Sequence, residues 1–424
     1  MDHFQYHNGT LHAENVSLAK IAQEVGTPVY VYSTATFQRH YRVFAEAFSG
    51  HDTLICYAMK ANSNQAVLTT LAREGSGADV VSVGELKRAL AAGIPADKIV
   101  FSGVGKTRTE MSFSLKAGIK QFNIESEAEL ELLNDVAGSL DMLAPVSVRV
   151  NPDVDAKTHE KISTGKSENK FGIPWHRAGA VYDRISELPH VTGVGVDLHI
   201  GSQLTDLEPF KLAFAKVVDL VKGLRANGHA ITHIDLGGGL GIPYEAGVEA
   251  PPSPGSYGKM VSEVLGDLDV SIIVEPGRLI AGNAGILLSE VIYEKTNDAK
   301  LFYIIDAAMN DLVRPAMYDA HHEIVPVNET TADKSLTADF VGPICESSDV
   351  FAKNRATTPL ASGDLVALKS AGAYSAVMAS TYNSRPLVPE VMVNGDDYAV
   401  VRKRQSIEEL IALDSVPAWL SGDD

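Results

Sequence analysis

The sequence contains only two cysteines among its 424 residues, Cys56 and Cys345. So few cysteines exclude a disulfide framework and a cysteine-rich zinc site, and no metal is expected. Positive charge is also scarce, because 36 Lys and Arg face 54 Asp and Glu, which gives a formal net charge of −18. Phosphate backbones repel such a surface unless a basic stripe attracts them, and the sequence has no such stripe. A nucleic-acid partner is therefore not expected.

Long hydrophobic runs are missing as well. No apolar segment approaches the roughly 20 residues that a membrane-spanning helix needs. The N-terminal sequence MDHFQYHNGT has no basic segment followed by an apolar one, so we expect no signal peptide, no membrane partner and a cytoplasmic location. The apolar fraction of 45% is sufficient for sizeable cores, and the length indicates two domains.

The first two thirds of the chain contain eight short runs rich in β-branched and apolar residues, separated by gaps of helical length. Ser82 and Ser126 are placed as N-caps of helices in two of these gaps. Strands that alternate with helices predict a parallel sheet closed into a (β/α)8 TIM barrel, and a doubly wound open sheet is the alternative. The eight expected strands are Leu54–Lys60, Ala78–Val83, Ile99–Val104, Gln121–Ser126, Val146–Asn151, Val194–Ile200, His233–Leu236 and Ser271–Glu275.

The pattern changes after Ala284, where turn residues rather than long helices separate the strand-like segments. This texture predicts a mainly β C-terminal domain over 284–424, after a barrel over 31–283. Residues 1–30 are expected to be an N-terminal segment that joins the β domain, because Phe4–Val16 favours strands. One helix is expected at Ser406–Leu413. The strand-like segments are GILLSEVIYEKT, KLFYIIDAAM, SLTADFVGPI, DLVALKS, EVMVNG and DDYAVVRK.

Polar residues follow several of the expected barrel strands. Lys60 ends the first strand in YAMKAN, and His199 and Ser202 follow the sixth in DLHIGSQ. The seventh strand ends in DLGGGLG and the eighth in VEPGR, which contains Glu275. In a parallel barrel these strand ends meet at one rim, where active sites form. The sequence therefore predicts a site at this rim.

Each rim residue allows a structural and a functional interpretation. Lys60 is either a solvated strand end or a lysine that forms a Schiff base. His199 is either a core histidine or a ring stacked on a planar cofactor, and the glycines form either a tight turn or a phosphate-binding backbone. Glu275 must be paired if it is buried, and a protonated pyridine nitrogen is one such partner. Arg278 could hold a substrate carboxylate.

Other motifs are weaker. SGVGKT resembles a phosphate-binding loop but lacks its leading glycine, because Val100 stands at that position. The pair His321–His322 could ligate a metal, but adjacent side chains rarely converge and no third ligand is evident. A lone cysteine such as Cys345 is usually a small buried hydrophobe. The polar setting of Cys345 in CESSD makes an inert role less expected.

Six segments, in their order along the chain, resemble the diaminopimelate decarboxylases: YAMKAN, HIGSQ, DLGGGLG, EPGR, CESSD and GAYSAVMASTYNSRP. HIGSQ, together with CESSD followed by YNSRP, separates this family from the ornithine and arginine decarboxylases. The family comprises pyridoxal 5′-phosphate enzymes with a barrel followed by a β domain. The resemblance spans Pro28 to Val401 and implies decarboxylation of meso-2,6-diaminopimelate to L-lysine and CO2, the last step of lysine biosynthesis.

The resemblance also implies residue roles. Lys60, His199 and Cys345 would be catalytic: Lys60 would hold the cofactor as a Schiff base, His199 would stack on it, and Cys345 would donate a proton. A homodimer is implied, in which Cys345 reaches the partner's site. The implied cofactor-binding residues are Lys60, His199, Ser202, Gly238, Gly239, Glu275, Gly277, Arg278 and Tyr374. The implied substrate-binding residues are Arg278, Arg314, Tyr318, Glu346 and Tyr374.

Other functions remain open: a decarboxylase of another basic amino acid such as ornithine or arginine, a racemase, or a non-catalytic carrier of the cofactor. CESSD and the two arginines argue against the first, and the cysteine-bearing β domain argues against the other two. Departures from the family pattern are Ser375 in place of glycine, His321 in place of an aromatic residue, and LVPEV after YNSRP. None of them removes a catalytic side chain. STGKSENKFGI resembles the family's active-site loop.

Overall fold

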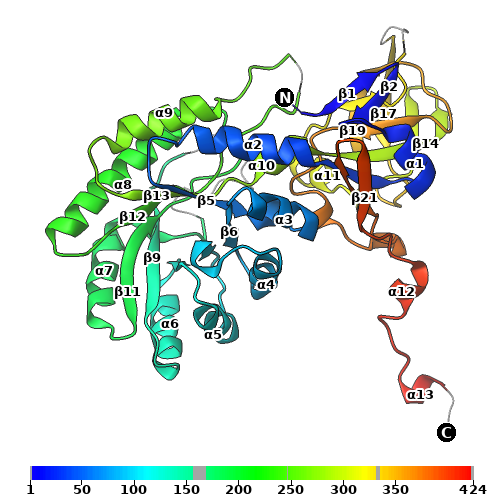
Figure 1. Cartoon of the computed structure of the whole chain (residues 1–424). Helices are drawn as coiled ribbons and strands as arrows, with labels where there is room; N and C mark the ends of the chain where they lie inside the picture. The colour runs from blue at the N-terminus through cyan, green and yellow to red at the C-terminus, as the bar shows by residue number, and fades with distance from the viewer. Residues whose placement is uncertain (1, 156–168, 246, 331–334, 422–424) are drawn as a thin grey trace. The chain divides into compact units, whose positions relative to one another are not determined.

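The computed structural model describes residues 2–155, 169–245, 247–330 and 335–421. It divides into two compact units (Figure 1). One unit, here called the β unit, combines Met1–Thr36 with Asn283–Asp424. The other, the barrel unit, is Phe37–Gly282. Within the described residues, no helix combines the length and the apolar character needed to span a membrane.

Eight parallel strands close the barrel. Each strand pairs with the next, β8 pairs with β9, and β13 pairs with β5, so the ring has no open edge. This arrangement confirms the predicted TIM barrel and excludes the open sheet. Every predicted barrel strand corresponds to one of these: β5 (Thr53–Ala58), β6 (Gly77–Val80), β7 (Ile99–Phe101), β8 (Gln121–Ile124), β9 (Ala144–Asn151), β11 (Val191–Asp197), β12 (His233–Asp235) and β13 (Ser271–Val274).

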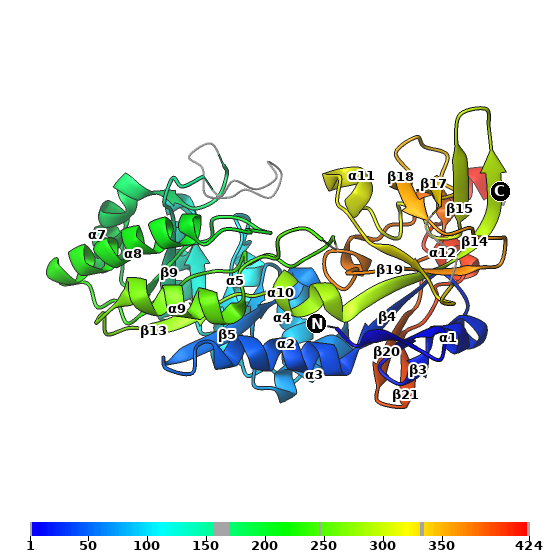
Figure 2. The same cartoon turned by 90° about the horizontal axis from the view of Figure 1, so that it is seen from above.

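Helices lie outside this ring in both views (Figures 1 and 2). Two of their starts follow the predicted caps, because Ser82 Oγ accepts the N–H of Glu85 and Ser126 Oγ accepts that of Glu129. The helices are α2 (Thr34–Glu46), α3 (Gln65–Arg73), α4 (Val83–Ala91), α5 (Arg108–Ala117), α6 (Glu127–Ser139), α7 (Ala178–Glu187), α8 (Glu208–Ala226), α9 (Pro254–Leu265) and α10 (Arg278–Ala281), and the short strand β10 (Ile173–Pro174) pairs with β9.

The described residues of the β unit form two sheets and four short helices. The first sheet orders β1 (Phe4–His7), β2 (Thr10–Ala13) and β3 (Val16–Ser17), which agrees with the strands predicted near the N-terminus. The helices are α1 (Leu18–Val25), α11 (Arg314–Tyr318), α12 (Ile407–Ile411) and α13 (Ala418–Ser421). The second sheet holds β4 (Val29–Ser33), β14 (Gly285–Thr296), β15 (Leu301–Ile305), β16 (Ile324–Pro326), β17 (Leu336–Val341), β18 (Val350–Thr357), β19 (Leu365–Leu368), β20 (Glu390–Asn394) and β21 (Asp397–Arg402).

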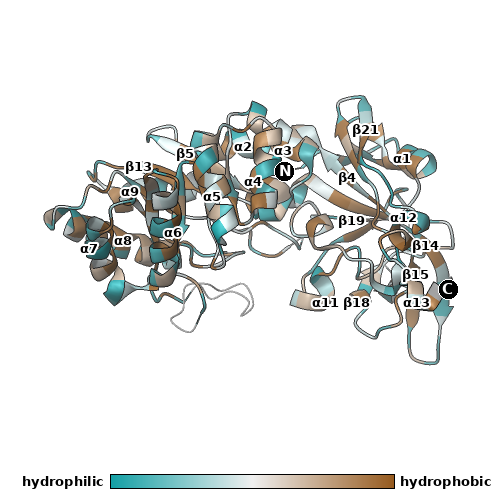
Figure 3. Cartoon of the chain, turned by 90° about the horizontal axis from the view of Figure 1, so that it is seen from below, coloured by the Kyte–Doolittle hydropathy of each residue, from teal (hydrophilic) through white to brown (hydrophobic). Residues whose placement is uncertain are grey.

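The sequence analysis missed strand β4 and placed residues 31–36 in the barrel. The structure puts them in the β unit, because β4 pairs antiparallel with β14 and parallel with β20. All five β4 residues are buried, and Val29 and Val31 pack in a core with Ile286 and Val391. Figure 3 shows β19, which also pairs with β14, as mainly hydrophobic. A strand buried on both faces lacks the polar alternation that signals a half-buried strand.

Candidate active site

The carboxyl ends of the barrel strands bring the predicted rim residues together. Lys60 lies in the 3-10 turn Met59–Ala61 after β5, and His199 follows β11. Gly238 follows β12, and its N–H lies 3.2 Å from His199 Nδ1. Glu275 follows β13, and its carbonyl oxygen would lie 2.3 Å from a Cβ added at Gly238. The ends of at least three strands therefore converge on one small region.

Lys60 is held by a buried carboxylate. Its Nζ lies 2.6 Å from Oδ2 of Asp79, which lies in β6 beside β5. The Asp79 side chain is fully buried, whereas that of Lys60 is 37% exposed. The lysine is thus an anchored amine with an accessible face and not a simple solvated strand end. The sequence analysis did not identify Asp79.

His199 is a neutral ring at physiological pH. Its Nδ1 accepts the Gly238 N–H, which leaves the proton of the neutral ring on Nε2. Burial lowers the pKa of His199 well below its usual value, and the Arg149 and Lys60 cations lower this pKa further. A neutral ring of fixed orientation suits stacking on a planar group better than acid catalysis.

The glycine turn after β12 brings the backbone close to its neighbours. Gly237 and Gly239 have φ of +64° and +114°, which residues with a side chain rarely adopt. A Cβ at Gly239 would also lie 2.4 Å from the carbonyl oxygen of Gly201. Phosphate sites in such barrels form at the loops after the seventh and eighth strands, and Gly238, Gly239 and Gly277 lie in these two loops. The turn therefore fits a phosphate group.

Arg278 is fixed at the same rim. Its Nη2 donates to Ser202 Oγ at 3.0 Å, and its Nη1 donates to the hydroxyl of Tyr244 at 2.6 Å. Arg278 is 7% exposed. The sequence analysis named Arg278 and Ser202 but missed Tyr244, which lies outside every motif that it used.

A layer of buried charge lies at this end of the barrel interior. Arg149, Asp197 and Asp235 are neighbours in register on β9, β11 and β12. One oxygen each of Asp197, Asp235 and Glu275 lies within 4.8 Å of the other two. Two buried charges 4 Å apart repel by about 4 kcal/mol at an effective dielectric constant of 20. Burial raises the pKa of all three carboxyls, that of Asp235 to about 7.

A second buried network holds Arg149. Its Nη1 lies 3.0 Å from Glu125 Oε1, and Glu125 also accepts the N–H of Gly103 at 2.8 Å. Lys106, from the rejected SGVGKT motif, has its Nζ 2.6 Å from Glu129 Oε1. Glu129 in turn accepts the N–H of Glu125 at 3.0 Å. Lys106 therefore stabilises the barrel by binding a buried carboxylate, which gives it a structural role.

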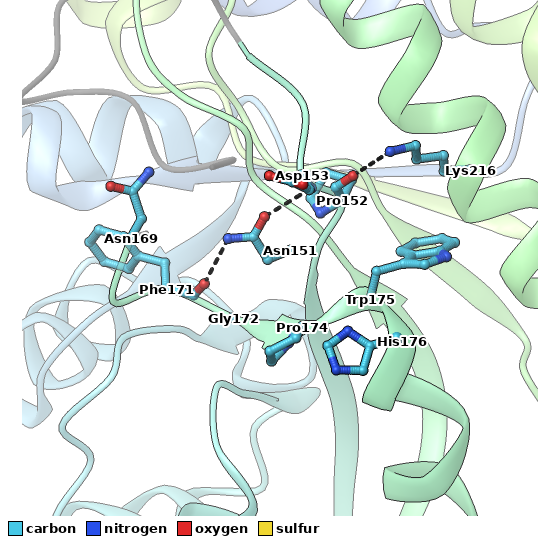
Figure 4. A pocket seen from close by; sticks show the side chains of 10 residues that line it. All are labelled: Asn151, Pro152, Asp153, Asn169, Phe171, Gly172, Pro174, Trp175, His176 and Lys216. Carbon is cyan, nitrogen blue, oxygen red and sulfur yellow. Dashed lines mark hydrogen bonds between the residues drawn. The ribbon is translucent and has the colours of Figure 1, made fainter. Parts of the chain in front are cut away.

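A pocket of about 360 Å³ lies at the end of β9 (Figure 4). Trp175 and His176 line one part of it, and Lys216 Nζ donates to the carbonyl oxygen of Pro152 at 2.6 Å. Phe171 lines it too, and its ring centre is 5.0 Å from Arg149 Cζ. Of the predicted active-site loop STGKSENKFGI, Asn169, Phe171 and Gly172 line this pocket. Residues 156–168 lie outside the described residues.

In the β unit, Cys345 and Glu346 are both exposed. The Cys345 N–H donates to Asn383 Oδ1 at 3.2 Å, and Glu346 Oε1 accepts the Ser348 hydroxyl at 2.5 Å. The first bond joins the CESSD segment to YNSRP, the second lies within CESSD, and the thiol stays at the surface. Cys56 differs, because it is buried in β5 and burial raises the pKa of its thiol well above the usual value.

Arg314 is buried at the start of α11, and a histidine fixes it. Its Nη1 lies 2.9 Å from Nε2 of His322, whose Nδ1 lies 2.8 Å from the carbonyl oxygen of Lys369. Because arginine can only donate, Nε2 must accept and Nδ1 must carry the proton. His322 was considered as a metal ligand in the sequence analysis; its observed contacts are to Arg314 and Lys369.

The remaining predicted residues also lie in the β unit. Tyr318 ends α11, and Tyr374 is half-buried with φ of +55°. Pro315 of α11 and Ser347 of the CESSD segment line one pocket of about 350 Å³. Segments 314–318 and 345–349 therefore lie close together. The predicted site residues form two groups, one in each unit: Lys60, His199, Ser202, Gly238, Gly239, Glu275, Gly277 and Arg278 in the barrel unit, and Arg314, Tyr318, Cys345, Glu346 and Tyr374 in the β unit.

Comparisons with known proteins agree with this chemistry. Residues 34–282 match the family model of the pyridoxal-dependent decarboxylase, pyridoxal binding domain. The chain is 49% identical to a diaminopimelate decarboxylase of Zymomonas mobilis over 98% of its length and 99% of the relative. It is 51% identical to one of Vibrio cholerae with the same coverage. A crystal structure of diaminopimelate decarboxylase from M. jannaschii in complex with L-lysine superposes with a TM-score of 0.94 at 37% identity and covers 99% of both chains.

Proposed function

This chain belongs to the diaminopimelate decarboxylases, and we propose that it acts on meso-2,6-diaminopimelate with the residues at its barrel rim and in its β unit. It is a carboxy-lyase that depends on pyridoxal 5′-phosphate and forms L-lysine and CO2. The observation that carries the assignment of residues is the rim itself. There an anchored amine, a neutral histidine, a glycine turn and a buried glutamate lie together.

The rim residues fit the cofactor. The turn after β12 permits close approach of a phosphate, because side chains at Gly238 or Gly239 would collide with neighbouring backbone. Glu275 is a buried carboxyl that accepts only two long hydrogen bonds among those observed, 3.4 Å each from Ser102 and Asn123. When bound, pyridoxal phosphate supplies an electron sink for the pair left by departing CO2.

The chain's own residues divide the remaining work. Lys60 Nζ would hold the cofactor covalently, and the ion pair with Asp79 orients this amine. Glu275 would keep a proton on the ring nitrogen, since an adjacent carboxylate favours a cation. His199 would cover the ring with a flat uncharged face. Gly238, Gly239, Gly277, Ser202 and Tyr374 complete the proposed cofactor contacts.

Substrate selection is assigned to charged groups of both units. The distal end of diaminopimelate carries an ammonium and a carboxylate. Glu346 suits the ammonium, and Arg278 and Arg314 suit the carboxylate, with Tyr318 and Tyr374 as further contacts. A substrate without the distal carboxylate would leave a buried guanidinium unpaired, which disfavours ornithine and lysine.

Cys345 is proposed to protonate the α-carbon after CO2 leaves. A cysteine thiol carries a transferable proton and can serve as a general acid. Its exposure is consistent with contact to substrate or to another chain. We assign Cys345 to the site of a partner subunit in a homodimer, and a cytoplasmic location goes with this proposal.

Mixing two inactive variants tests the dimer directly. If Cys345 serves the partner's site, Lys60→Ala and Cys345→Ala chains refolded or co-expressed together form heterodimers with one complete site. Random pairing then restores about a quarter of wild-type activity, because half of the dimers are mixed and each has one working site of two. If the cysteine serves its own chain, no activity returns.

The function itself is tested with purified protein and meso-diaminopimelate, with and without pyridoxal phosphate. We expect CO2 and lysine to form only when the cofactor is present. Equal turnover of ornithine would instead indicate the broader basic-amino-acid decarboxylase. Cofactor binding without CO2 release from either substrate would indicate a carrier.

A further inference from the structure

The barrel mouth contains more buried carboxyl groups than the proposed reaction uses. Glu275 faces the cofactor in that proposal, but Asp197 and Asp235 have no role in it, although they are only 2% and 0% exposed. Strand register places both beside Arg149, and one oxygen of each lies within 4.8 Å of Glu275. A layer this deeply buried requires a physical explanation.

Positive charge is insufficient to neutralise the three carboxyls. Arg149 is opposite Asp197 in register, but its Nη1 already lies 3.0 Å from Glu125. Carboxylates this close in a buried site cannot all be ionised, so at least one holds a proton. The three carboxyls also interact electrostatically with other ionisable groups. These are Asp79 on β6 with its partner Lys60, Glu125, Cys56 on β5, Tyr182 on α7 and Tyr257 on α9.

Asp235 and Glu275 are close enough to share a proton, because a hydrogen bond between their side chains opposes the rise in the pKa of Asp235 that burial causes. Asp235 Oδ1 accepts the Gly237 N–H at 3.1 Å. Asp235 Oδ2 and Asp197 Oδ1 are both buried, and among the described residues neither oxygen has a partner at ordinary hydrogen-bond geometry. Glu275 Oε1 accepts only the long contacts from Ser102 and Asn123. A proton on Asp235 Oδ2 would give both carboxyls a short, strong hydrogen bond.

We propose that Asp235 is a positioning residue, a neutral acid that donates a hydrogen bond from Oδ2 to Glu275 and thereby keeps the Glu275 carboxylate ionised and oriented toward the cofactor's ring nitrogen. In the cofactor-free protein the two carboxyls share this proton, and the cationic ring nitrogen localises it on Asp235. Asp197 lies opposite Arg149 in register, and the Arg149 charge opposes the rise in pKa that burial causes, so we assign Asp197 as ionised. The inference rests on the proposed role of Glu275.

Two substitutions at one position separate a neutral acid from an ionised one. Asp235→Asn keeps an acceptor for Gly237 and places an N–H donor where the proton would be, so it mimics the neutral acid. Asp235→Ala removes both groups. We expect Asp235→Asn to bind pyridoxal phosphate within about threefold of wild type, and Asp235→Ala to bind it at least about tenfold more weakly, the usual effect of losing a hydrogen bond to a charged group.

Infrared difference spectra of the cofactor-loaded protein at pH 6.5 supply a readout that does not depend on activity, with Asp197→Asn as the matched control. The wild-type minus Asp235→Asn spectrum is expected to show one protonated carboxyl, and the wild-type minus Asp197→Asn spectrum an ionised carboxylate. An ionised carboxylate in the first spectrum overturns the inference, as does cofactor binding by Asp235→Asn as weak as that of Asp235→Ala. If the carboxyl is protonated but the wild type forms no lysine from diaminopimelate, the function fails and this inference stands.

Discussion

The two units present their proposed site residues in different ways. In the barrel unit the charged groups are buried or anchored: Lys60 on Asp79 at 2.6 Å, and Arg278 on Ser202 and Tyr244. In the β unit, Cys345 and Glu346 are exposed, whereas Arg314, the first residue of α11, is buried. The same protein thus combines a fixed rim with an accessible segment.

This difference matches the division of work that we propose. A group that holds a cofactor benefits from a rigid environment, because each hydrogen bond made in advance lowers the cost of ordering it during the reaction. A group that must reach the substrate of a partner subunit has to lie at the surface of its own chain. Substitutions at the rim should therefore alter cofactor binding, and those at the exposed segment should alter turnover.

The largest effect is expected for Lys60→Ala. Loss of the proposed nucleophile should lower activity by about 10³-fold or more, since removal of such a group costs up to about 10⁶ in other enzymes. The absorbance of the bound cofactor should change to that of the free aldehyde. Retention of the lysine-bound absorbance would refute the assignment.

Lys106→Met is the matched control for Lys60→Ala. Lys106 is a second buried lysine of the same unit, paired with Glu129 at 2.6 Å. Breaking a buried pair from one side costs about 3–5 kcal/mol of the free energy of unfolding. We expect reduced stability with an unchanged cofactor absorbance, because Lys106 belongs to the structural network around Glu125.

The two cysteines give a smaller but sharper contrast. Cys345→Ala should lower kcat by about 10²-fold, the lower end for loss of a general acid, with cofactor affinity unchanged. Cys56→Ala should leave kcat unchanged and lower the free energy of unfolding by about 1 kcal/mol, because it removes one buried sulfur atom and leaves a small void. A thiol reagent should modify exposed Cys345 and spare Cys56 in the folded protein. Full turnover by Cys345→Ala would exclude its role as proton donor.

The rim could be predicted because its chemistry is encoded by position. Strand periodicity locates the barrel strands, and any polar residue just past a strand end, such as Lys60 or Glu275, must lie at the mouth. The partners Asp79 and Asp235 were missed although they lie near the ends of strands too, because no motif distinguishes them. Their roles depend on side-chain contacts between different strands, and these contacts form only when the sheet closes.

The β unit was harder to predict in detail. Its strands are visible as apolar runs, but β4 pairs with β14 from more than 250 positions away, a contact that no local pattern announces. Arg314 was identified through the family resemblance, whereas His322 was weighed only as a metal ligand. The buried bond between them could be found only in the folded chain.

His322 provides the next contrast, with its neighbour His321 as control. His322→Leu removes the acceptor that fixes buried Arg314, and we expect KM for diaminopimelate to rise about tenfold with a smaller change in kcat. His322→Gln, which restores an acceptor, should recover part of this loss. His321→Leu removes contacts to Glu323 and Arg355 and should have little effect on KM. Equal effects of the two leucine variants would separate Arg314 from substrate binding.

The smallest effect is expected far from the mouth, at the buried histidine His233. Its Nε2 lies 2.5 Å from Gln121 Oε1, and burial lowers its pKa from 6.5 to about 4. The unfolded chain therefore binds a proton between pH 6.5 and 4 that the folded barrel does not. Its contribution to stability is present above pH 6.5 and is lost as the pH falls toward 4, by at most about 1.4 kcal/mol per pH unit.

His233→Gln tests this sign, because glutamine cannot titrate. Urea unfolding of the barrel, followed by a probe in that unit, should show a shallower loss of stability on acidification than the wild type. Above pH 6.5, where His233 is neutral in both the folded and the unfolded state, the stability of the variant and that of the wild type should change equally with pH. A steeper loss in the variant would mean that His233 is protonated in the folded barrel, and the Gln121 contact would then be a charged hydrogen bond. Because Asp235 and Glu275 have raised pKa values, they lower stability as the pH rises, so the comparison with the variant isolates the histidine.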